Sequence, residues 1–334
     1  MYTLSASRRR LLKLGVALAA VPLTPRFAFA SAAPANAEAL AGVTLRVATY
    51  KGGWPPLLAA SGLADTPYRI EWHELNNGLL HIEAINADAL DIGSGSEIPA
   101  VFAARQNANV KFIARTREDL NNQATLARKD TPIQRIADLK GKRVGYVRAT
   151  TSHYFLYRQL TEAGLSFDDI HAINLAPADG LPAFAGGDID AWAIYGYNGQ
   201  LARNRYGARE LATGKGYLSG NFPIYANPRA LDDARRRAAI GDLLVRLRHA
   251  YAWANPHFID YARAQSAETR VPVDDLVAMF NRRSDDFGLL AVTPDVISGH
   301  QEVANVFAHI GVLDGPTNVA PFWDASFTPI IQSA

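Results

Sequence analysis

The chain has 334 residues, with 34 Lys and Arg against 32 Asp and Glu, 49% hydrophobic residues and no cysteine. Five of the bases lie in residues 1–30, which carry no acid, so 29 bases remain against 32 acids and no basic excess favours nucleic-acid binding. The lack of cysteine excludes disulfides, thiolate metal sites, cysteine nucleophiles and a lipid anchor on cysteine. The remaining length suffices for two domains of ordinary size.

Residues 1–30 have the order of a signal peptide: a basic head, an apolar run at 14–23, and Ala-Phe-Ala at 28–30. The apolar run is shorter than the roughly 18 residues that span a bilayer. Arg8 and Arg9, followed by Leu-Leu-Lys at 11–13, resemble a twin-arginine signal, although a Sec signal also has a basic head. Both predict export, so we expect a soluble periplasmic protein without a lipid anchor. Residues 31–41 are small and unpatterned, which predicts a flexible mature N-terminus.

From Val43 onward, short β-branched runs alternate with helical stretches, which predicts a mostly parallel sheet covered by helices on both faces. The expected elements are strands at 44–48, 68–72 and 90–93 with helices near 55–64 and 79–87. After Pro132 the scheme recurs, with strands at 143–147 and 170–175 around a helix at 152–163. The sequence therefore predicts two α/β units.

Two segments match each other, Ala-Asp-Ala-Leu-Asp-Ile-Gly at 87–93 and Gly-Gly-Asp-Ile-Asp-Ala-Trp at 186–192. Each combines an acidic turn with a buried strand, and we interpret them as the same structural step taken once in each unit. After residue 226, apolar residues recur at spacings of three and four. This pattern predicts helices at 231–254, 257–264, 272–282 and 294–310.

Several short motifs stand in order between residues 138 and 194. They are Asp-Leu-Lys-Gly-Lys-Arg-Val-Gly at 138–145, Thr-Thr-Ser-His-Tyr at 150–154, Gly-Leu-Ser-Phe-Asp-Asp-Ile at 164–170, Leu-Ala-Pro-Ala-Asp at 175–179 and Asp-Ile-Asp-Ala-Trp-Ala-Ile at 188–194. Together they resemble the aliphatic-sulfonate-binding proteins, of the nitrate/sulfonate/taurine group of ABC-transporter substrate-binding proteins. The likeness extends from about Leu45 to Phe322.

The resemblance implies the type II periplasmic-binding-protein fold, in which two α/β lobes joined by two crossovers close over a ligand between them. We place lobe 1 at 42–124 plus 224–334 and lobe 2 at 125–223. The implied function is that of a receptor for an ABC importer. Its partners are a small sulfonate-like organic anion and a membrane permease, and it is expected to be a monomer without cofactor or metal. A sulfate ester, a taurine-like zwitterion, nitrate or a thiamine precursor are the alternative ligands.

An enzyme on the same fold is the competing class of function. Related enzymes, an aromatic sulfinate desulfinase and thiamine-pyrimidine synthases, depend on a reactive cysteine that this chain lacks. The sequence also has no Gly-x-Ser-x-Gly, phosphate-loop or His-Glu-x-x-His motif. We therefore expect a binding protein with no catalytic residues.

A sulfonate keeps its charge and offers three acceptor oxygens, so it needs converging donors such as the N–H groups at helix N-termini. Two strand-to-helix turns are suited to this, although their hydroxyls are equally explained as plain helix caps. The candidates in these turns are Ser94, Gly95, Ser96, Glu97, Arg148, Thr150, Thr151, Ser152 and His153.

Residues after other predicted strand ends complete the candidate set: Lys51, Gly53, Trp54, Trp192 and Tyr195. Their aromatic rings would cover the organic tail of the ligand, or else pack in the core. Glu97 departs from the family pattern, which has Thr or Ser before the proline. Its carboxylate would stabilise a helix start or pair with an ammonium group of a zwitterionic ligand, whereas it would repel a bare anion. The exact ligand therefore stays open.

Overall fold

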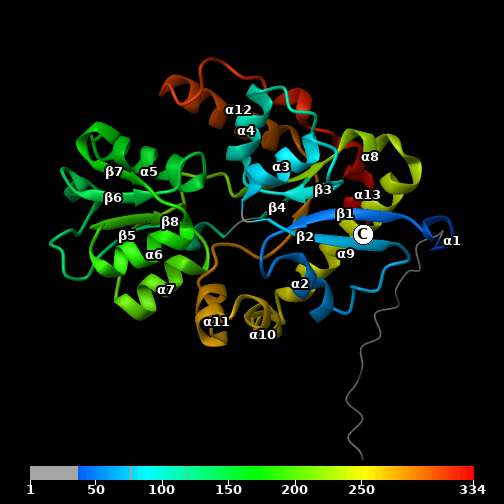
Figure 1. The fold of residues 1–334 in the computed structure, drawn as a ribbon, viewed down its shortest axis with the longest axis horizontal. Coiled ribbons are helices and arrows are strands. Elements are labelled where there is room, and N and C mark those ends of the chain that lie inside the picture. Colours follow the sequence, from blue (N-terminus) through cyan, green and yellow to red (C-terminus); the bar gives the residue numbers. More distant parts are fainter. Residues whose placement is uncertain (1–36, 76, 118) are drawn as a thin grey trace, which may run out of the picture. The chain divides into compact units, whose positions relative to one another are not determined.

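Two β-sheets organise the described residues, 37–75, 77–117 and 119–334 of a computed structural model (Figure 1). The predicted signal peptide and residues 31–36 lie outside this range. The first sheet has strand order β11-β4-β10-β3-β1-β2 and the second β7-β6-β8-β5-β9. The strands are β1 Thr44–Thr49, β2 Arg69–Glu74, β3 Ile92–Ser94, β4 Lys111–Arg117, β5 Ala124–Ala127, β6 Arg143–Tyr146, β7 His171–Asn174, β8 Ala191–Ile194, β9 Arg209–Thr213, β10 Asn221–Ala226 and β11 Leu289–Leu290.

The chain crosses between the two sheets twice, once from β4 to β5 and once from β9 back to β10. In the first sheet β1 is parallel to β2 and β3, while β10 runs antiparallel to β3 and β4. In the second, β6 is parallel to β7 and β8, while β5 is antiparallel to β8 and β9. We call the part with the first sheet lobe 1 and the part with the second sheet lobe 2. The predicted two α/β units are confirmed.

The return crossing differs slightly from the expected position. Strand β10 begins at Asn221, so residues 221–223 pair with β4 in lobe 1 rather than belonging to lobe 2. A proline inside a run argues against a central strand, and Pro223 nevertheless faces Arg115 in this one. The register of β10 shifts just beyond it, between Ile224 and Tyr225, where the ladder is irregular.

Residues 37–41 belong to the segment that the sequence predicts to be a flexible N-terminus, and they make packing and hydrogen-bond contacts with lobe 1. Ala37–Leu40 form the short helix α1, and Leu40 is only 4% exposed in the core of lobe 1. Arg235 donates hydrogen bonds to the carbonyls of Ala39 and Ala41, at 2.9 and 2.6 Å. The burial of Leu40 and the two hydrogen bonds from Arg235 therefore fix this segment in place, although its sequence shows no pattern typical of a helix or strand.

The remaining helices cover the sheets. They are α2 Trp54–Ala60, α3 Gly78–Asn86, α4 Glu97–Arg105, α5 Thr151–Glu162, α6 Pro177–Gly186, α7 Tyr197–Tyr206, α8 Pro228–Asp232, α9 Ala234–Ala254, α10 Phe258–Thr269, α11 Val273–Asn281, α12 Pro294–His309 and α13 Thr328–Ser333. The helix predicted at 231–254 is divided at Asp233, whose carboxylate accepts the N–H groups of Arg235 and Arg236 and so starts α9 afresh.

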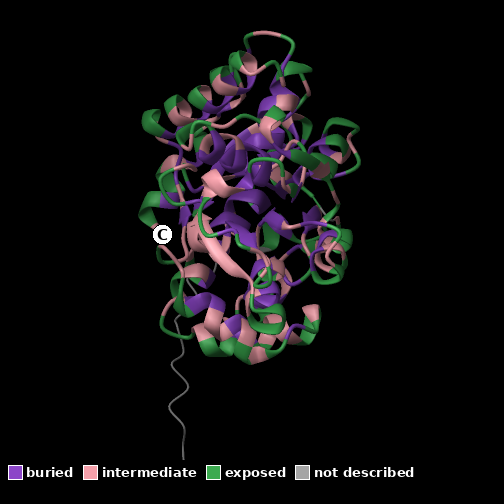
Figure 2. Cartoon of the chain, turned by 90° about the vertical axis from the view of Figure 1, so that its left-hand side faces the viewer, coloured by how far each residue is buried: buried purple, intermediate pink, exposed green. Residues whose placement is uncertain are grey.

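Strand alternation decides which face of lobe 2 each helix covers. Ala191 and Ala193 of β8 belong to the core cluster beneath α5, and Trp192 and Ile194 belong to the cluster beneath α6 and α7. Helix α5 accordingly lies on one face of the sheet and α6 and α7 on the other (Figure 1). Figure 2 shows the buried residues concentrated on the strands and the inner helix faces.

The two matching segments do take the same structural step. Asp91 accepts the main-chain N–H of Arg46 at 2.8 Å and pairs with its guanidinium at 2.7 Å. Asp190 does the same with Arg143, at 2.9 and 2.7 Å. In each lobe, therefore, an aspartate that precedes a buried strand binds an arginine on the neighbouring parallel strand: Asp91 before β3 binds β1, and Asp190 before β8 binds β6.

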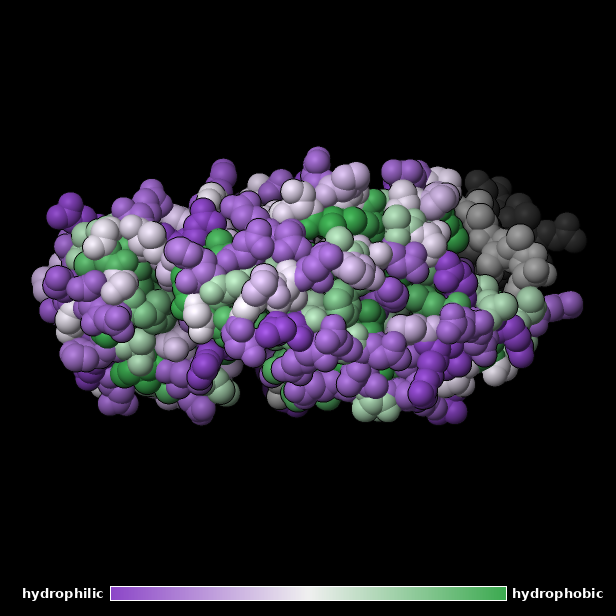
Figure 3. All heavy atoms as spheres, turned by 90° about the horizontal axis from the view of Figure 1, so that it is seen from above, coloured by the Kyte–Doolittle hydropathy of each residue, from purple (hydrophilic) through white to green (hydrophobic). Residues whose placement is uncertain are grey.

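Hydrophilic side chains cover most of the face seen in Figure 3, with hydrophobic ones scattered among them. None of the helices in the described ranges is both long and apolar enough to cross a membrane.

Candidate functional site

The turn after β3 is held by two side chains of lobe 1, His81 and Tyr50. The N–H of Ser94 donates to Nδ1 of His81 at 3.2 Å, and the hydroxyl of Tyr50 donates to the Ser94 carbonyl at 3.2 Å. Burial lowers the pKa of His81 to about 4, which keeps the imidazole neutral and able to accept. Gly95 lies against Gly78 at the start of α3, since a Cβ on Gly95 would sit 2.8 Å from the Gly78 Cα. The turn is therefore fixed on both sides.

The main-chain carbonyls of Ser96 and Glu97, further along this turn, also accept hydrogen bonds from side chains of other elements. Tyr225 donates its hydroxyl to the Ser96 carbonyl at 2.7 Å, and Nε2 of His300 lies 2.9 Å from the Glu97 carbonyl. Nδ1 of His300 accepts from Trp323 Nε1 at 3.1 Å, so the proton sits on Nε2 and His300 is the donor to Glu97. Because these carbonyls already accept hydrogen bonds, the groups of the turn that still lack a hydrogen-bond partner are the first N–H groups of α4.

Ser96 is the N-cap of α4, yet its hydroxyl does not cap the helix. Across the described ranges, the hydroxyls of Ser94 and Ser96 have no hydrogen-bond partner, although both residues are buried. These two, together with the N–H groups of the first turn, form a set of donors of the kind that an anion needs.

Glu97 occupies the first position of α4 and is 2% exposed. Its Oε1 accepts the hydroxyl of Ser219 at 2.7 Å, while Oε2 is buried without a partner among the described residues. Burial raises the pKa of Glu97 to about 7, an effect that the Ser219 hydrogen bond and the charge of Arg115 oppose. The carboxyl thus has no ion-pair partner within the described ranges and sits at the centre of the candidate site.

The turn after β6 carries the second group of candidates at the head of α5. Thr150, its N-cap, donates to the Val147 carbonyl at 2.7 Å instead of capping the helix. Ser152 accepts the Val147 N–H at 3.0 Å and lies 3.0 Å from the Thr150 hydroxyl. Both hydroxyls therefore brace the turn, and Ser152 is fully buried. That Ser152 also contacts the ligand stays a prediction.

Thr151 and Arg148 remain available at the same turn. In the described part of the chain, the Thr151 hydroxyl has no partner and the exposed Arg148 guanidinium forms no ion pair. Ala149 between them has φ 58°, in the left-handed region that L-residues rarely adopt. Such strain occurs where surrounding structure enforces a functional conformation. His153 accepts the Ala149 N–H at Nδ1, and burial first, then the charge of Arg148, lowers its pKa to about 4.

Tyr195 joins the end of β8 to this turn. It hydrogen-bonds Thr150, and burial raises its pKa to about 12. The heads of α4 and α5 share one hydrophobic cluster, which contains Ile98 and Tyr154 from their first turns and Phe307 of α12. The rings of Tyr154 and Phe307 lie 5.4 Å apart, and the Glu97 charge also acts on the pKa of Tyr154. The structure therefore brings the two predicted turns, one from each lobe, together.

The two tryptophan candidates lie in the core instead. Trp192 is fully buried and packs on Gly180 of α6, where an added Cβ would approach within 2.4 Å of its ring. Strand alternation directs it there, as described for β8. Trp54 packs in the core of lobe 1 and donates to the Tyr251 hydroxyl at 3.2 Å. Neither is included in the site that we propose.

Lys51 and Gly53 occupy the turn between β1 and α2. Lys51 is exposed, and Gly53 is the N-cap of α2 with its N–H donated to the Tyr50 carbonyl at 2.9 Å. A Cβ on Gly53 would lie 2.8 Å from the Thr49 hydroxyl, so a glycine is required by the packing of the turn itself. Lys51 supplies a mobile positive charge beside it.

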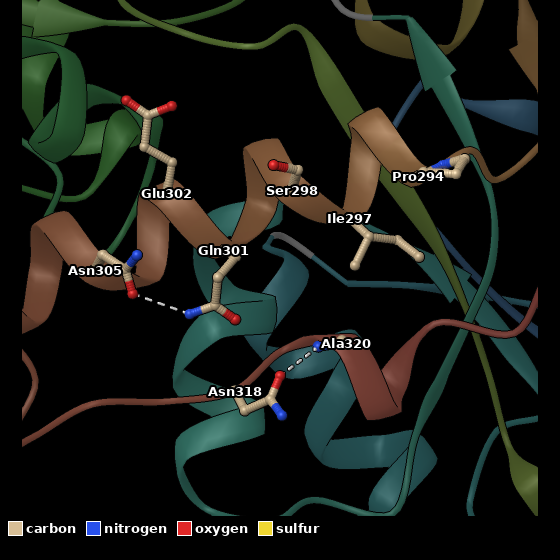
Figure 4. Close-up of a pocket in the computed structure, with 8 residues that line it drawn as sticks. All are labelled: Pro294, Ile297, Ser298, Gln301, Glu302, Asn305, Asn318 and Ala320. Carbon is tan, nitrogen blue, oxygen red and sulfur yellow. Dashed lines mark hydrogen bonds between the residues drawn. The ribbon is translucent and has the colours of Figure 1, made fainter.

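A separate open cavity of about 600 Å³ lies on α12 (Figure 4). Its lining contains none of the predicted site residues: Pro294, Ile297, Ser298, Gln301, Glu302, Asn305, Asn318 and Ala320. Within the described ranges, no group of three or more His, Asp or Glu side chains stands close enough to hold a metal ion.

Residues that sequence reasoning missed do most of the positioning. His81, His300, Tyr50 and Tyr225 are not among the candidates that the sequence indicated. One signal was present: His300 falls on the apolar stripe of α12 with Val296, Val303 and Phe307. A histidine on such a stripe is buried and must satisfy its ring nitrogens internally.

The fold and these turns define the class of the protein. Two α/β lobes joined by two crossovers form the type II periplasmic-binding-protein fold, as predicted. The chain superposes on the periplasmic aliphatic sulphonate binding protein SsuA of Escherichia coli with TM-score 0.76 and 26% identity, over 85% of this chain and 92% of that one. The alkanesulfonate-binding protein SsuA of Xanthomonas axonopodis pv. citri, bound to MOPS, gives TM-score 0.76 at 24% identity, over 85% and 99%.

The sequence comparisons agree. Residues 69–215 match the NMT1/THI5-like family. A putative aliphatic sulfonates-binding protein of Escherichia coli K12 is 35% identical over 207 residues, which cover 60% of this chain and 63% of that protein, so the match spans less than two thirds of this relative. The taurine-binding periplasmic protein of the same organism is 27% identical over 126 residues, 38% of this chain and 39% of that protein. Over part of its length the chain is thus similar to the aliphatic-sulfonate-binding proteins.

One distant structural neighbour is an enzyme. The desulfurization enzyme DszB matches with TM-score 0.63 and 15% identity, over 87% of this chain and 99% of that one. Identity this low shows a shared fold alone.

Proposed function

We propose that this protein is an exported solute-binding receptor of an ABC importer, which captures a sulfonate-type organic anion between its lobes. One observation carries the proposal. At the N-termini of α4 and α5, the hydroxyls of the N-cap residues Ser96 and Thr150 do not accept a hydrogen bond from the first-turn N–H groups of the helix. Around them stand three hydroxyls without partners in the described ranges, which belong to the buried residues Ser94, Ser96 and Thr151. This arrangement supplies several neutral donors and one free cation, Arg148, to an acceptor-rich anion.

The names of the relatives support the same ligand class, since they include sulfonate-binding and taurine-binding proteins. A sulfate ester has the same acceptor geometry at its charged end and remains an alternative ligand, as do nitrate and a thiamine precursor. A taurine-like zwitterion is the alternative that Glu97 would favour if it stayed ionised. The partner in the membrane would be the permease of the importer, and the receptor would act as a monomer.

We propose a binding function without catalysis, although DszB carries the same fold. The chain contains no cysteine. The histidines nearest the two turns, His81, His153 and His300, use a ring nitrogen to fix backbone groups, and burial lowers the pKa of each to about 4. Neutral, buried imidazoles committed to structure are poorly placed for acid–base chemistry near neutral pH.

Thr151 and Ser152 provide a matched pair that tests the site. Thr151→Ala should weaken binding of butanesulfonate by about tenfold to hundredfold with little change in stability, because its hydroxyl serves only the ligand. Ser152→Ala should instead lower the free energy of unfolding by about 1–3 kcal/mol, because it leaves the partly buried Val147 N–H without its acceptor. Calorimetric titration and melting curves measure the two effects.

The control for this pair is Thr161→Ala, at the exposed end of α5, where the hydroxyl only donates to the Tyr157 carbonyl. It should leave both affinity and stability close to those of the unmodified protein. Wild-type affinity in Thr151→Ala would show that the anion binds elsewhere.

We also propose that residues 1–30 direct export through the twin-arginine route, on the strength of Arg8 and Arg9 in the order Ser-Arg-Arg-x-Leu-Leu-Lys. Replacing both arginines by lysine keeps the charge and should leave the precursor in the cytoplasm. Cell fractionation measures this outcome. Normal export of the double variant would reassign the segment to the Sec route.

A further inference from the structure

We propose that capture of the anion is coupled to the uptake of one proton by Glu97. The inference deepens the proposed function, because it concerns the site at the head of α4. It also narrows the ligand class to anions that carry no ammonium group of their own, since the neutral carboxyl then needs no cation.

The surroundings of Glu97 are those of a neutral acid. The side chain is buried, one oxygen accepts from Ser219, and the other has no partner in the described ranges. Arg115 of β4 is the nearby cation, but it forms no ion pair with Glu97, and its own Nε is buried without a partner in the described ranges. An ionised carboxylate buried without a paired cation is strongly disfavoured.

The groups around the carboxyl come from every element packed against it. They are Arg115 of β4, Tyr154 of α5, Ser219 before β10, Tyr225 of β10, and His300 and Glu302 of α12. His300 is neutral and faces the main chain, and Glu302 is exposed and adds a second negative charge nearby. The Ser219 hydrogen bond and the charge of Arg115 favour ionisation of Glu97, but burial outweighs them and Glu302 acts in the same direction as burial. The balance is therefore shifted toward the protonated form.

An arriving sulfonate shifts this balance further. It would bind at the N–H groups of the turn that Glu97 itself occupies, and a second negative charge at that distance raises the energy of the carboxylate but not of the acid. Protonated Glu97 has an O–H, which makes Oε2 a donor instead of an orphaned acceptor. The proton and the anion therefore stabilise each other in the closed site.

The direction of the pH dependence follows from the same balance. Burial raises the pKa of Glu97 to about 7, so a fraction of the ligand-free protein is ionised at neutral pH and above. Because the bound state holds one more proton than the free state there, affinity should fall by about tenfold for each pH unit above neutrality. A zwitterion would reverse the preference, since its ammonium group would pair with ionised Glu97 and no proton would be taken up.

Calorimetric titration with butanesulfonate and with taurine tests the coupling. At each pH, two buffers of different ionisation enthalpy report the number of protons taken up: Tris and triethanolamine at about pH 8, and bis-Tris and succinate at about pH 6. Common sulfonate buffers are avoided because they would compete. We expect butanesulfonate to bind more tightly than taurine, with uptake approaching one proton at about pH 8 and little uptake at about pH 6.

Glu97→Gln and Glu302→Gln form the matched variants. The first should abolish both the proton uptake and the fall in affinity with pH, because glutamine is a permanently neutral donor. The second removes a neighbouring, exposed acid and should retain both. The carboxyl-carbon NMR signal that disappears in Glu97→Gln should titrate near neutrality in the ligand-free protein and remain protonated in the complex.

Butanesulfonate binding without proton uptake would overturn the coupling while leaving the receptor function intact. Proton uptake that persists in Glu97→Gln would overturn its assignment to Glu97. Tighter binding of taurine, lost in Glu97→Gln, would show that the carboxylate is ionised and would also overturn the proposal. Absence of binding by either sulfonate at any pH would overturn the proposed function itself, and the coupling with it.

Discussion

Replacement of Gly95 by alanine is expected to weaken anion binding by roughly a hundredfold. Most of this loss would arise because the added methyl group overpacks the turn. A Cβ at this position would lie 2.6 Å from the Tyr225 hydroxyl and 2.8 Å from the Gly78 Cα. Tyr225 would have to move, and its hydrogen bond to the Ser96 carbonyl would break. The head of α4 would then lose the orientation of its N–H donors.

The free energy of unfolding should fall by about 1–3 kcal/mol in the same variant. Gly299→Ala on α12 is the control, because no atom lies within 4 Å of its added Cβ. It should leave affinity unchanged and raise stability by up to about 1 kcal/mol, as alanine favours a helix interior. Wild-type affinity in Gly95→Ala would mean that this turn does not hold the anion.

Glu97→Gln is expected to stabilise the ligand-free protein by about 3 kcal/mol at pH values above neutrality, and by little near pH 5. The pKa of Glu97 in the folded protein is raised to about 7 from an ordinary value of 4.5. Between these values the folded state binds more protons than the unfolded state, so stability falls as pH rises through this window. Glutamine has no charge to bury and escapes this loss.

Denaturant titrations of both proteins at several pH values measure the effect. The buried histidines have the opposite pH dependence to Glu97. Because their pKa values are lowered in the folded protein, they reduce the free energy of unfolding as the pH falls. Their contribution is the same in both proteins and cancels in the difference. A difference in stability that does not change with pH would show that Glu97 ionises as freely in the folded protein as in the unfolded chain.

Much of the fold was predictable because its elements have strong local signals. Strand β1 and helices α5 and α12 lie within two residues of their expected bounds. Alternating strands and helices dictated the two α/β units, and ordered motifs indicated the family. The helix at 37–40 and the pairing of residues 221–223 with β4 had no local signal, because both depend on distant partners, namely Arg235 and strand β4.

The site was predictable only at the level of its turns. Strand ends followed by hydroxyl residues correctly located the heads of α4 and α5, since these turns lie where local sequence determines the structure. Roles within the turns were not predictable. Ser152 braces Val147 and Trp192 packs on Gly180, because side-chain direction depends on tertiary contacts. The donors that fix the first turn, such as His300, lie about 200 residues away along the chain.

The most direct test of a receptor function is an equilibrium titration of the mature protein with butanesulfonate, followed by recovery of the ligand. We predict saturable binding of one ligand per chain and return of butanesulfonate chemically unchanged, as measured by calorimetry and mass spectrometry. Conversion of the sulfonate to another product would contradict the account and make the protein an enzyme on a receptor fold.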